Sequence, residues 1–171
     1  MRASLENEYT NRLHTMKKTS LSLVALIMTS IFAAGGSHYL NTEPTMIITK
    51  SSFDVSTTTD KLIEVIQGKG LNLFSKVDHA AGAQKADLDL RPTTLIIFGN
   101  PKVGTLLMQC DQKMGYELPM KMLVWENEAG ETSVGYYDPL TQNDRYELDN
   151  CQQVLNNVKN ALAGIVKEAL N

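Results

Sequence analysis

Thr94-Leu95-Ile96-Ile97-Phe98-Gly99-Asn100-Pro101 is the stretch that decides the fold of this 171-residue chain. The run from Thr94 to Phe98 is rich in β-forming apolar side chains, which is typical of a central, buried strand. Asn100 and Pro101 then predict a helix start, because Asn accepts a hydrogen bond at the N-cap and Pro loses none at the first helical position. A buried strand that leads directly into a helix predicts a layered domain of sheet and helices.

The remainder of the chain adds similar segments around this strand. One helix is predicted with its N-cap among Thr57 to Asp60, and residues 151–169 repeat apolar side chains at helical spacing. Residues 127–131 suit a hairpin turn. Further strands are predicted at residues 46–49, 71–77, 120–125 and 132–137. This order predicts a two-layer α/β or α+β sandwich, in which helices pack on one mixed sheet of about five strands.

Residues 1–36 match a secretory signal peptide. Two lysines form a basic start, an apolar run of 14 residues follows at 21–34, and small residues then suit signal peptidase. The run is shorter than the about 20 residues of a membrane span, so cleavage and export are predicted in preference to a retained anchor. Translation from Met1 with a long basic region and translation from Met16 both fit this pattern.

The mature protein is then expected to be a loose tether at residues 37–45 followed by one domain at residues 46–171. We expect it in the periplasm or outside a bacterial cell, in contact with a membrane only through an uncleaved signal segment. Removing residues 1–36 lowers the net charge from −3 to −5, because that segment holds four basic and two acidic residues. A mildly acidic domain without a basic cluster argues against nucleic acid or an anionic membrane surface as a partner.

Cys110 and Cys151 are the only two cysteines, and both are predicted to point inward from helices. Export delivers them to an oxidising compartment, which favours one disulfide between them. Two buried free thiols that pack as small apolar side chains are the alternative.

Several short motifs, in this order along the chain, carry a family resemblance. They are residues 78–83 (DHAAGA), 90–93 (LRPT), 98–105 (FGNPKVGT), 118–121 (LPMK) and 137–139 (YDP). Together they resemble the bacterial domain of unknown function 302 over about residues 46 to 170. The resemblance implies a two-layer α/β domain that is dimeric and often exported, and it supplies no activity. Many relatives have Asn where this chain has Tyr137.

The candidate ligand-binding residues are His79, Asn100, Lys102 and Asp138. His79 is the one imidazole of the predicted domain, and a histidine beside Asp78 is a candidate catalytic acid or base, or else simply satisfies a backbone group at a corner. Free amides at the helix start after Gly99, together with Lys102, suit a small anion, although a plain helix cap explains Asn100 equally well. If the strands before His79 and before Asn100 are parallel neighbours, both residues reach the same edge of the sheet.

Two hypotheses of function follow from these residues. The first is a non-catalytic module that binds a small ligand or a protein partner, paired as a homodimer through its sheet or hairpin. The second is an enzyme acting on a small anionic metabolite, with His79 as acid or base and Lys102 as anchor. No cofactor is expected, and no metal either, because one His and two inward Cys on separate helices form no ligand cluster.

Overall fold

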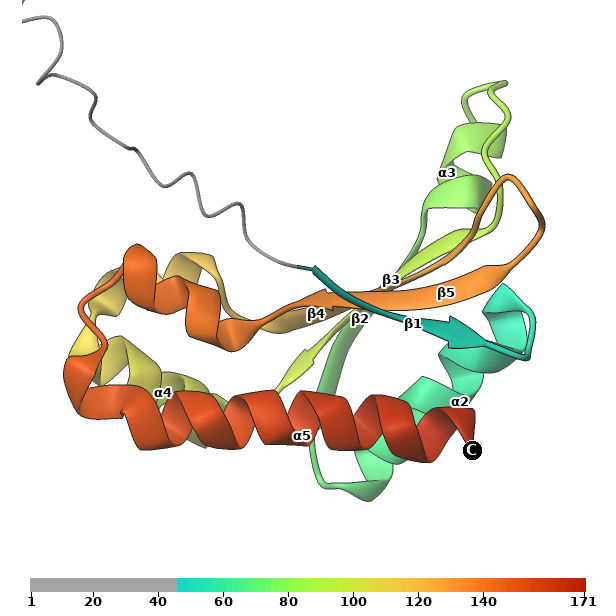
Figure 1. Cartoon of the computed structure of the whole chain (residues 1–171). Coiled ribbons are helices and arrows are strands. Elements are labelled where there is room, and N and C mark those ends of the chain that lie inside the picture. The colour runs from blue at the N-terminus through green and yellow to red at the C-terminus, as the bar shows by residue number, and fades with distance from the viewer. Residues whose placement is uncertain (1–45) are drawn as a thin grey trace, which may run out of the picture. The chain divides into compact units, whose positions relative to one another are not determined.

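The computed structural model describes residues 46–171, so the predicted signal peptide and tether lie outside the described residues. Five strands form one sheet in the order β1-β5-β4-β3-β2, and α2 and α5 lie along one of its faces (Figure 1). The strands are β1 (Met46–Ser51), β2 (Asn72–Asp78), β3 (Thr93–Gly99), β4 (Met120–Glu126) and β5 (Thr132–Tyr137). The α-helices are α2 (Val55–Gly68), α3 (His79–Gln84), α4 (Pro101–Cys110) and α5 (Gln152–Leu170). Short 3-10 helices complete the order as η1 (Gln112–Tyr116), η2 (Pro139–Asp144) and η3 (Asp149–Cys151). The predicted two-layer α+β fold is confirmed.

The directions of the strands differ from the prediction. All four pairings in the sheet are antiparallel, so the sheet is not mixed. β2 and β3 are neighbours as expected, but Asn72 pairs with Gly99 and Asp78 with Thr94, which makes them antiparallel. The reason lies in the connection between them, since a parallel pair needs a crossover that returns the chain along the sheet. Residues 79–92 do not return; α3 projects from the end of the sheet instead (Figure 1).

Helix α2 begins earlier than predicted, because Asp54 and not a residue of the Thr57–Asp60 group is its N-cap. The Asp54 carboxylate accepts a hydrogen bond from the Thr57 amide at 2.7 Å. That hydrogen bond lowers the pKa of the Asp54 carboxyl. Thr58 and Thr59, which the sequence offered as caps, lie inside the helix and are fully buried.

Two apolar clusters form the interior. The larger one joins the sheet to α2 and α5 and includes the fully buried Ile96, Met122, Leu62 and Ile165. Each such side chain stabilises the fold by roughly 1.5–3 kcal/mol relative to full exposure. The smaller cluster joins α4 and η1 to the start of α5, and Val158 of α5 packs against both clusters.

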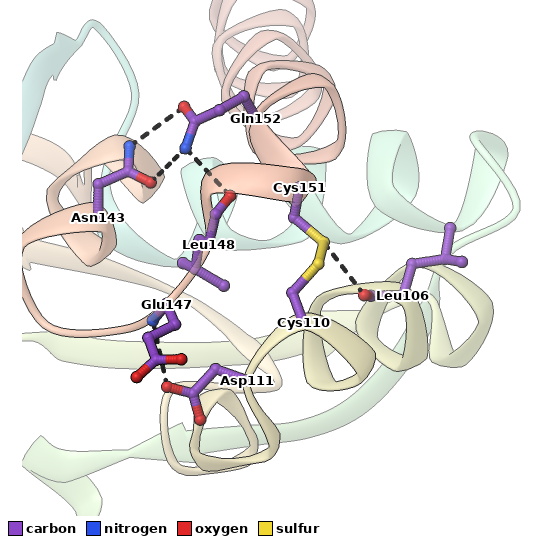
Figure 2. The surroundings of a disulfide bond; sticks show 8 residues. All are labelled: Leu106, Cys110, Asp111, Asn143, Glu147, Leu148, Cys151 and Gln152. Carbon is purple, nitrogen blue, oxygen red and sulfur yellow. Dashed lines mark hydrogen bonds between the residues drawn. A yellow bond between two sulfur atoms is a disulfide. The ribbon is translucent and has the colours of Figure 1, made fainter.

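The disulfide between Cys110 and Cys151 lies in the smaller cluster. It links the last residue of α4 to the residue that precedes α5, with 6.4 Å between the two Cα atoms (Figure 2). Asp111, the next residue, accepts hydrogen bonds from the amides of Lys113 and Glu147 and so joins η1 to the loop before η3. The two sulfur atoms thus meet at the place where α4 packs on α5, and both predicted inward positions are confirmed.

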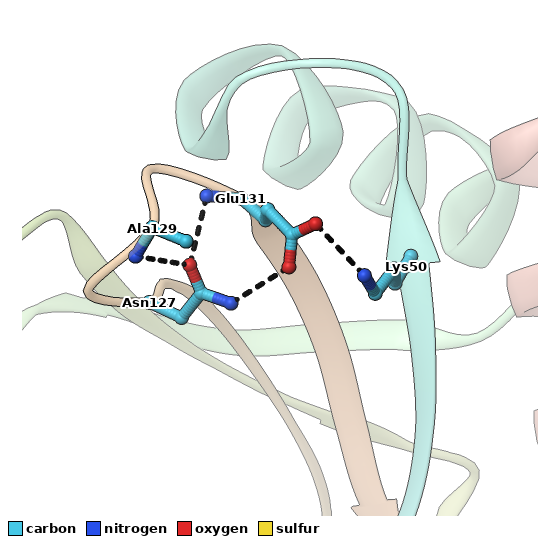
Figure 3. Close-up of polar contacts among 4 residues, drawn as sticks. All are labelled: Lys50, Asn127, Ala129 and Glu131. Atoms are coloured by element: carbon cyan, nitrogen blue, oxygen red, sulfur yellow. Dashed lines mark hydrogen bonds and ion pairs between the residues drawn. The ribbon is translucent and has the colours of Figure 1, made fainter.

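The β4–β5 hairpin closes through the side chain of Asn127, as Figure 3 shows. Its carbonyl oxygen accepts hydrogen bonds from the amides of Ala129 and Glu131, both at 2.9 Å, and its amide group donates to Glu131. Glu131 also pairs with Lys50 of β1 at 2.8 Å. The positive φ of Gly130, 75°, completes the turn, since glycine adopts this conformation without a Cβ clash. The predicted hairpin at 127–131 is confirmed.

Candidate functional site

The sheet has two ends, and the predicted site residues are divided between them. The α4 end holds the last residue of β3, the first of β4 and the last of β5, because Phe98 pairs with Met120 and β5 runs back to Tyr137. Asn100, Lys102 and Asp138 follow these strand ends. The α3 end holds Asp78 and His79. Because β2 and β3 are antiparallel, His79 is separated from Asn100 by the length of the sheet.

An apolar pocket of about 540 Å³ lies at the α4 end, where the two interior clusters adjoin. Its walls come from the start of β2, the end of β3, α4, the η1–β4 connection and α5. None of the side chains that line it is charged. Pockets of 300–1,000 Å³ with mainly apolar walls are the usual size for small ligands.

Residues without bulky side chains create this space. An added Cβ at Gly104 would lie 3.4 Å from the Leu118 side chain, and one at Gly115 would lie 3.3 Å from the Met108 sulfur. Ala161 contributes a small side chain from α5. Side chains at the two glycines would crowd Leu118 and Met108 in the pocket wall, so the wall depends on small residues there.

Asn100 lines the pocket, but its side chain is used to begin α4. The side-chain oxygen of Asn100 accepts a hydrogen bond from the Lys102 amide at 2.9 Å. The backbone oxygen of Asn100 accepts one from the Gly104 amide, also at 2.9 Å. Pro101 has no amide hydrogen, so among the described residues only Val103 keeps a free amide in this first turn. Lys102 is exposed between two lining residues and does not itself line the pocket. The start of α4 therefore offers an anion few hydrogen-bond donors.

Asp138 lies at the same end of the sheet, but it is tied to structural partners. Its carboxylate accepts the Leu140 amide at 3.0 Å and pairs with Lys159 of α5 at 2.7 Å. Burial opposes the charged form, but the hydrogen bonds from Lys159 and from the Leu140 backbone outweigh it and lower the pKa of the Asp138 carboxyl. This side chain fastens η2 to α5 and does not line the pocket.

His79 is the first residue of α3 and is exposed. Within the described part of the chain its ring forms no hydrogen bond. A second, polar hollow lies near it, lined by carboxylates that include Asp54, Asp78 and Glu126, yet His79 is not part of its wall. The four residues predicted to bind a ligand thus do not share one pocket, and His79 lies at the opposite end of the sheet from Lys102.

Two of the sequence motifs, at residues 98–105 and 118–121, line the pocket, and only the first was predicted to bind a ligand. The motif at 98–105 supplies the end of β3 and the first turns of α4. Phe74, Gly115 and Ala161 come from three other segments and carried no signal of their own. Among residues 46–171, no group of three His, Cys, Asp or Glu side chains is placed to hold a metal ion. The helices in this range also lack the combined length and hydropathy of a membrane span.

The architecture defines a class: a small two-layer α+β domain with one disulfide and an apolar pocket at one end of its sheet. Residues 47–165 match the family described as domain of unknown function DUF302, and the chain belongs to that family. The crystal structure of an uncharacterized conserved DUF302 protein from Bacillus stearothermophilus has the same fold, with a TM-score of 0.65 and 19% sequence identity. That similarity covers 72% of this chain and 97% of the other.

Curated relatives carry the name of a channel. The chain is 39% identical over 103 residues to the Fluoride-specific ion channel FluC 1 of Brucella suis biovar 1 (strain 1330), which covers 60% of this chain and 41% of the relative. The identity to FluC 1 of Brucella abortus biovar 1 (strain 9-941) is also 39%, over 38% of that protein. The chain thus spans about two fifths of the length of the curated relatives it matches.

Proposed function

We propose that this domain is a non-catalytic module that binds a small apolar or amphipathic molecule in the pocket at the α4 end. The observation that carries the proposal is a pocket of about 540 Å³ whose lining includes no charged side chain. Its polar atoms are largely occupied, since Asn100 caps α4 and the Thr105 hydroxyl donates to the Pro101 carbonyl at 2.8 Å. An apolar ligand gains from leaving water there, whereas a charged group would lose its hydration without a partner.

A pocket without charged lining does not suit fluoride. The relatives named as fluoride channels share only part of their length with this chain. A bare anion in a pocket without cationic lining is unfavourable because burying an unpaired charge costs several kcal/mol or more. Lys102, exposed between Pro101 and Val103, is the cation nearest in sequence to the lining of α4. If the ligand carries a carboxylate, this proposal places that group outside the pocket, near Lys102.

The test is a titration with a fluorescent fatty acid, with the matching fatty alcohol and sodium fluoride as competitors. Ala161→Trp, an exposed pocket-wall position, is expected to weaken binding of the fatty acid at least tenfold by filling the space. Ala163→Trp is the matched control, since Ala163 is also exposed on α5 and lies outside the wall. We expect the alcohol to compete and fluoride not to compete. Equal affinities of the two tryptophan variants, or no binding by wild type, would overturn the proposal.

Lys102→Ala separates the contribution of the carboxylate group of the ligand from that of its apolar chain. If Lys102 holds a carboxylate, the variant binds the fatty acid about tenfold more weakly, through loss of a charge-assisted hydrogen bond, and leaves the alcohol unchanged. Unchanged binding of both ligands would reject the role of Lys102 and leave the apolar pocket as the whole site. Mass spectrometry of molecules released from protein purified from its native compartment identifies the ligand itself.

We further propose that the domain works outside the cytoplasm. The Cys110–Cys151 disulfide supports this, because such bonds persist in oxidising compartments. The signal-peptide pattern of residues 1–36 supports it independently. Mature protein from the cell envelope is expected to begin within residues 35–38. An N-terminal sequence that retains residues 16–34 would show instead that the segment is an anchor.

A further inference from the structure

The face of the sheet opposite α2 and α5 is apolar along its centre, with Lys50 and Lys121 toward its margins. Side chains alternate between the two faces of a strand, and Ile96, Met122 and Val134 point into the helix-covered interior. Their neighbours therefore point to the other face. The strand register aligns one apolar row straight across all five strands, formed by Ile48, Gly135, Leu123, Leu95 and Val77. No helix lies along this face in the described part of the chain (Figure 1).

The centre of this open face is closely packed. An added Cβ at Gly135 would lie 2.8 Å from the Met46 sulfur and 2.9 Å from the Trp125 ring. Trp125 and Met46 therefore lie over the glycine and fill the space that a side chain would take. Ile48 and Tyr137 on the same face remain 56% and 49% exposed. An apolar surface with Trp, Tyr and Met has the composition of an interface core.

The arm, residues 79–92, projects on the same side of the sheet as this open face, away from α5 (Figure 1). It comprises α3 and the loop to β3. α3 contains no buried residue, and Leu88 and Leu90 of the loop are 66% and 50% exposed. An ordered segment that has no fully buried residue gains little from folding unless a partner covers it.

We propose that two copies of this chain pair face to face through the open side of the sheet, with each arm reaching across the end of the other copy. The area supports a second copy as the occupant. Strands of six or seven residues, about 4.8 Å apart and about 3.3 Å per residue, give the face roughly 500 Å² in projection. A stable interface buries about 800 Å² per partner, so the sheet face supplies a large part of that area and the arms supply contact beyond it.

The exposed apolar side chains select the orientation. Leu88 and Leu90 lie on the arm, whereas Phe74, Tyr116 and Tyr137 lie at or near the α4 end. In this dimer the two-fold axis lies midway between the two facing sheets and runs perpendicular to their strands. Rotation about that axis places the arm of each copy at the α4 end of the other. The two apolar patches then cover each other twice, as an isologous interface requires. This arrangement also brings His79 of one copy toward the partner's Asn100. Within one chain the two residues lie at opposite ends of the sheet.

The first experiment measures mass by light scattering and sedimentation of the purified protein over a range of concentrations. We expect a dimer, and Ile48→Glu and Leu88→Glu are each expected to raise the dimer dissociation constant at least tenfold. Both positions are exposed within one copy, so the substitutions leave the fold intact, which circular dichroism checks. Ala163→Glu, on the helix side, is the matched control and stays dimeric. A monomeric wild type, or a dimer unaffected by both substitutions, would overturn the proposal.

The second experiment tests the orientation with a short amine-reactive cross-linker on mixed light and heavy isotope-labelled copies. Lys85 of the arm and Lys102 of α4 lie at opposite ends of one chain, separated by the seven residues of β3, or about 23 Å. We expect cross-links between Lys85 of one copy and Lys102 or Lys121 of the other, detected as mixed-isotope peptides. Cross-links only between the two Lys85 residues would reject this orientation.

Discussion

At the α3 end of the sheet the Asp78 carboxylate accepts the Ala81 amide at 2.9 Å, and at the α4 end the Asn100 side chain accepts the Lys102 amide at the same distance. The two helices thus begin with equivalent caps. Their surroundings differ, because α4 buries Leu107 and ends at a disulfide, whereas α3 buries no residue. A cap therefore fixes where a helix begins, and the surface that covers the helix decides what it contributes to stability and to a site.

The largest expected effect is loss of the disulfide at the α4 end. In the chain-entropy model a loop of 41 residues contributes roughly 4 kcal/mol. Urea unfolding of the reduced protein is therefore expected to show a free energy of unfolding lower by about this amount than that of the oxidised protein. Hydrogen exchange is expected to rise in α4 and to stay unchanged in α3, which sharpens the difference between the two ends.

The control for this prediction is the double variant Cys110→Ser and Cys151→Ser, whose unfolding should not respond to reductant. Thiol titration of the unfolded protein without reductant tests whether the disulfide forms. Two free thiols would contradict the prediction. Equal unfolding free energies of the oxidised and reduced forms would mean that the bond does not stabilise the fold.

A smaller effect is expected at Asp138, which also belongs to the α4 end. Asp138→Asn removes the ion pair with Lys159 but keeps an oxygen that can cap η2, at a cost of about 1 kcal/mol, because Lys159 is partly exposed. The folded state lowers the pKa of the Asp138 carboxyl below its ordinary 3.8. The contribution is therefore complete above the unfolded pKa and disappears as the pH falls through the lower folded pKa.

Unfolding free energies of wild type and Asp138→Asn between pH 7 and pH 2 test this dependence. The two curves are expected to converge at the acid end of this range. Asp149→Asn, at an exposed position in η3, is the control and should follow wild type throughout. A gap between wild type and Asp138→Asn that stays constant with pH would reject the ion-pair explanation.

Most of the fold follows from local patterns, whereas the site depends on contacts that those patterns do not contain. The run at residues 94–98 and the Asn100-Pro101 start are sufficient to predict β3 and α4, because burial and capping act within a few residues. The direction of β2 relative to β3 depends on how residues 79–92 fold as a whole. Because β2 and β3 are antiparallel and not parallel, His79 and Asn100 lie at opposite ends of the sheet within a chain.

The chemistry of the site was less predictable than its position. The helix start after Gly99 indicated a binding site for anions, and a pocket does lie beside it. Asn100 itself accepts the amides of Lys102 and Gly104, which leaves only Val103 of the first turn for an anion. The space is made by Gly104, Gly115 and Ala161 from separate segments. Small residues in helices produce no periodic signal, so only the packed structure brings them together.

The smallest expected effect compares the two caps directly. Asn100→Ala is expected to lower the free energy of unfolding by about 1 kcal/mol, as for other N-caps, because α4 unfolds together with the smaller cluster. Asp78→Ala removes an equivalent hydrogen bond from a helix without buried residues. That helix opens locally without unfolding the rest of the chain, so the expected change in global unfolding free energy is only a few tenths of a kcal/mol.

Both substitutions are best measured in the Ile48→Glu background, where the arm is expected to be free of a partner and the unfolding of one copy is observed. Urea unfolding gives the global free energies, and hydrogen exchange at Ala81 and Gly104 reports opening of each helix. We expect Asp78→Ala to accelerate exchange in α3 alone. In the wild-type background the same substitution is expected to weaken the dimer, because a frayed arm must be ordered again on pairing. Equal global losses for the two caps in the Ile48→Glu background would contradict the contrast drawn between the ends, since they would mean that α3 is coupled to the core as firmly as α4.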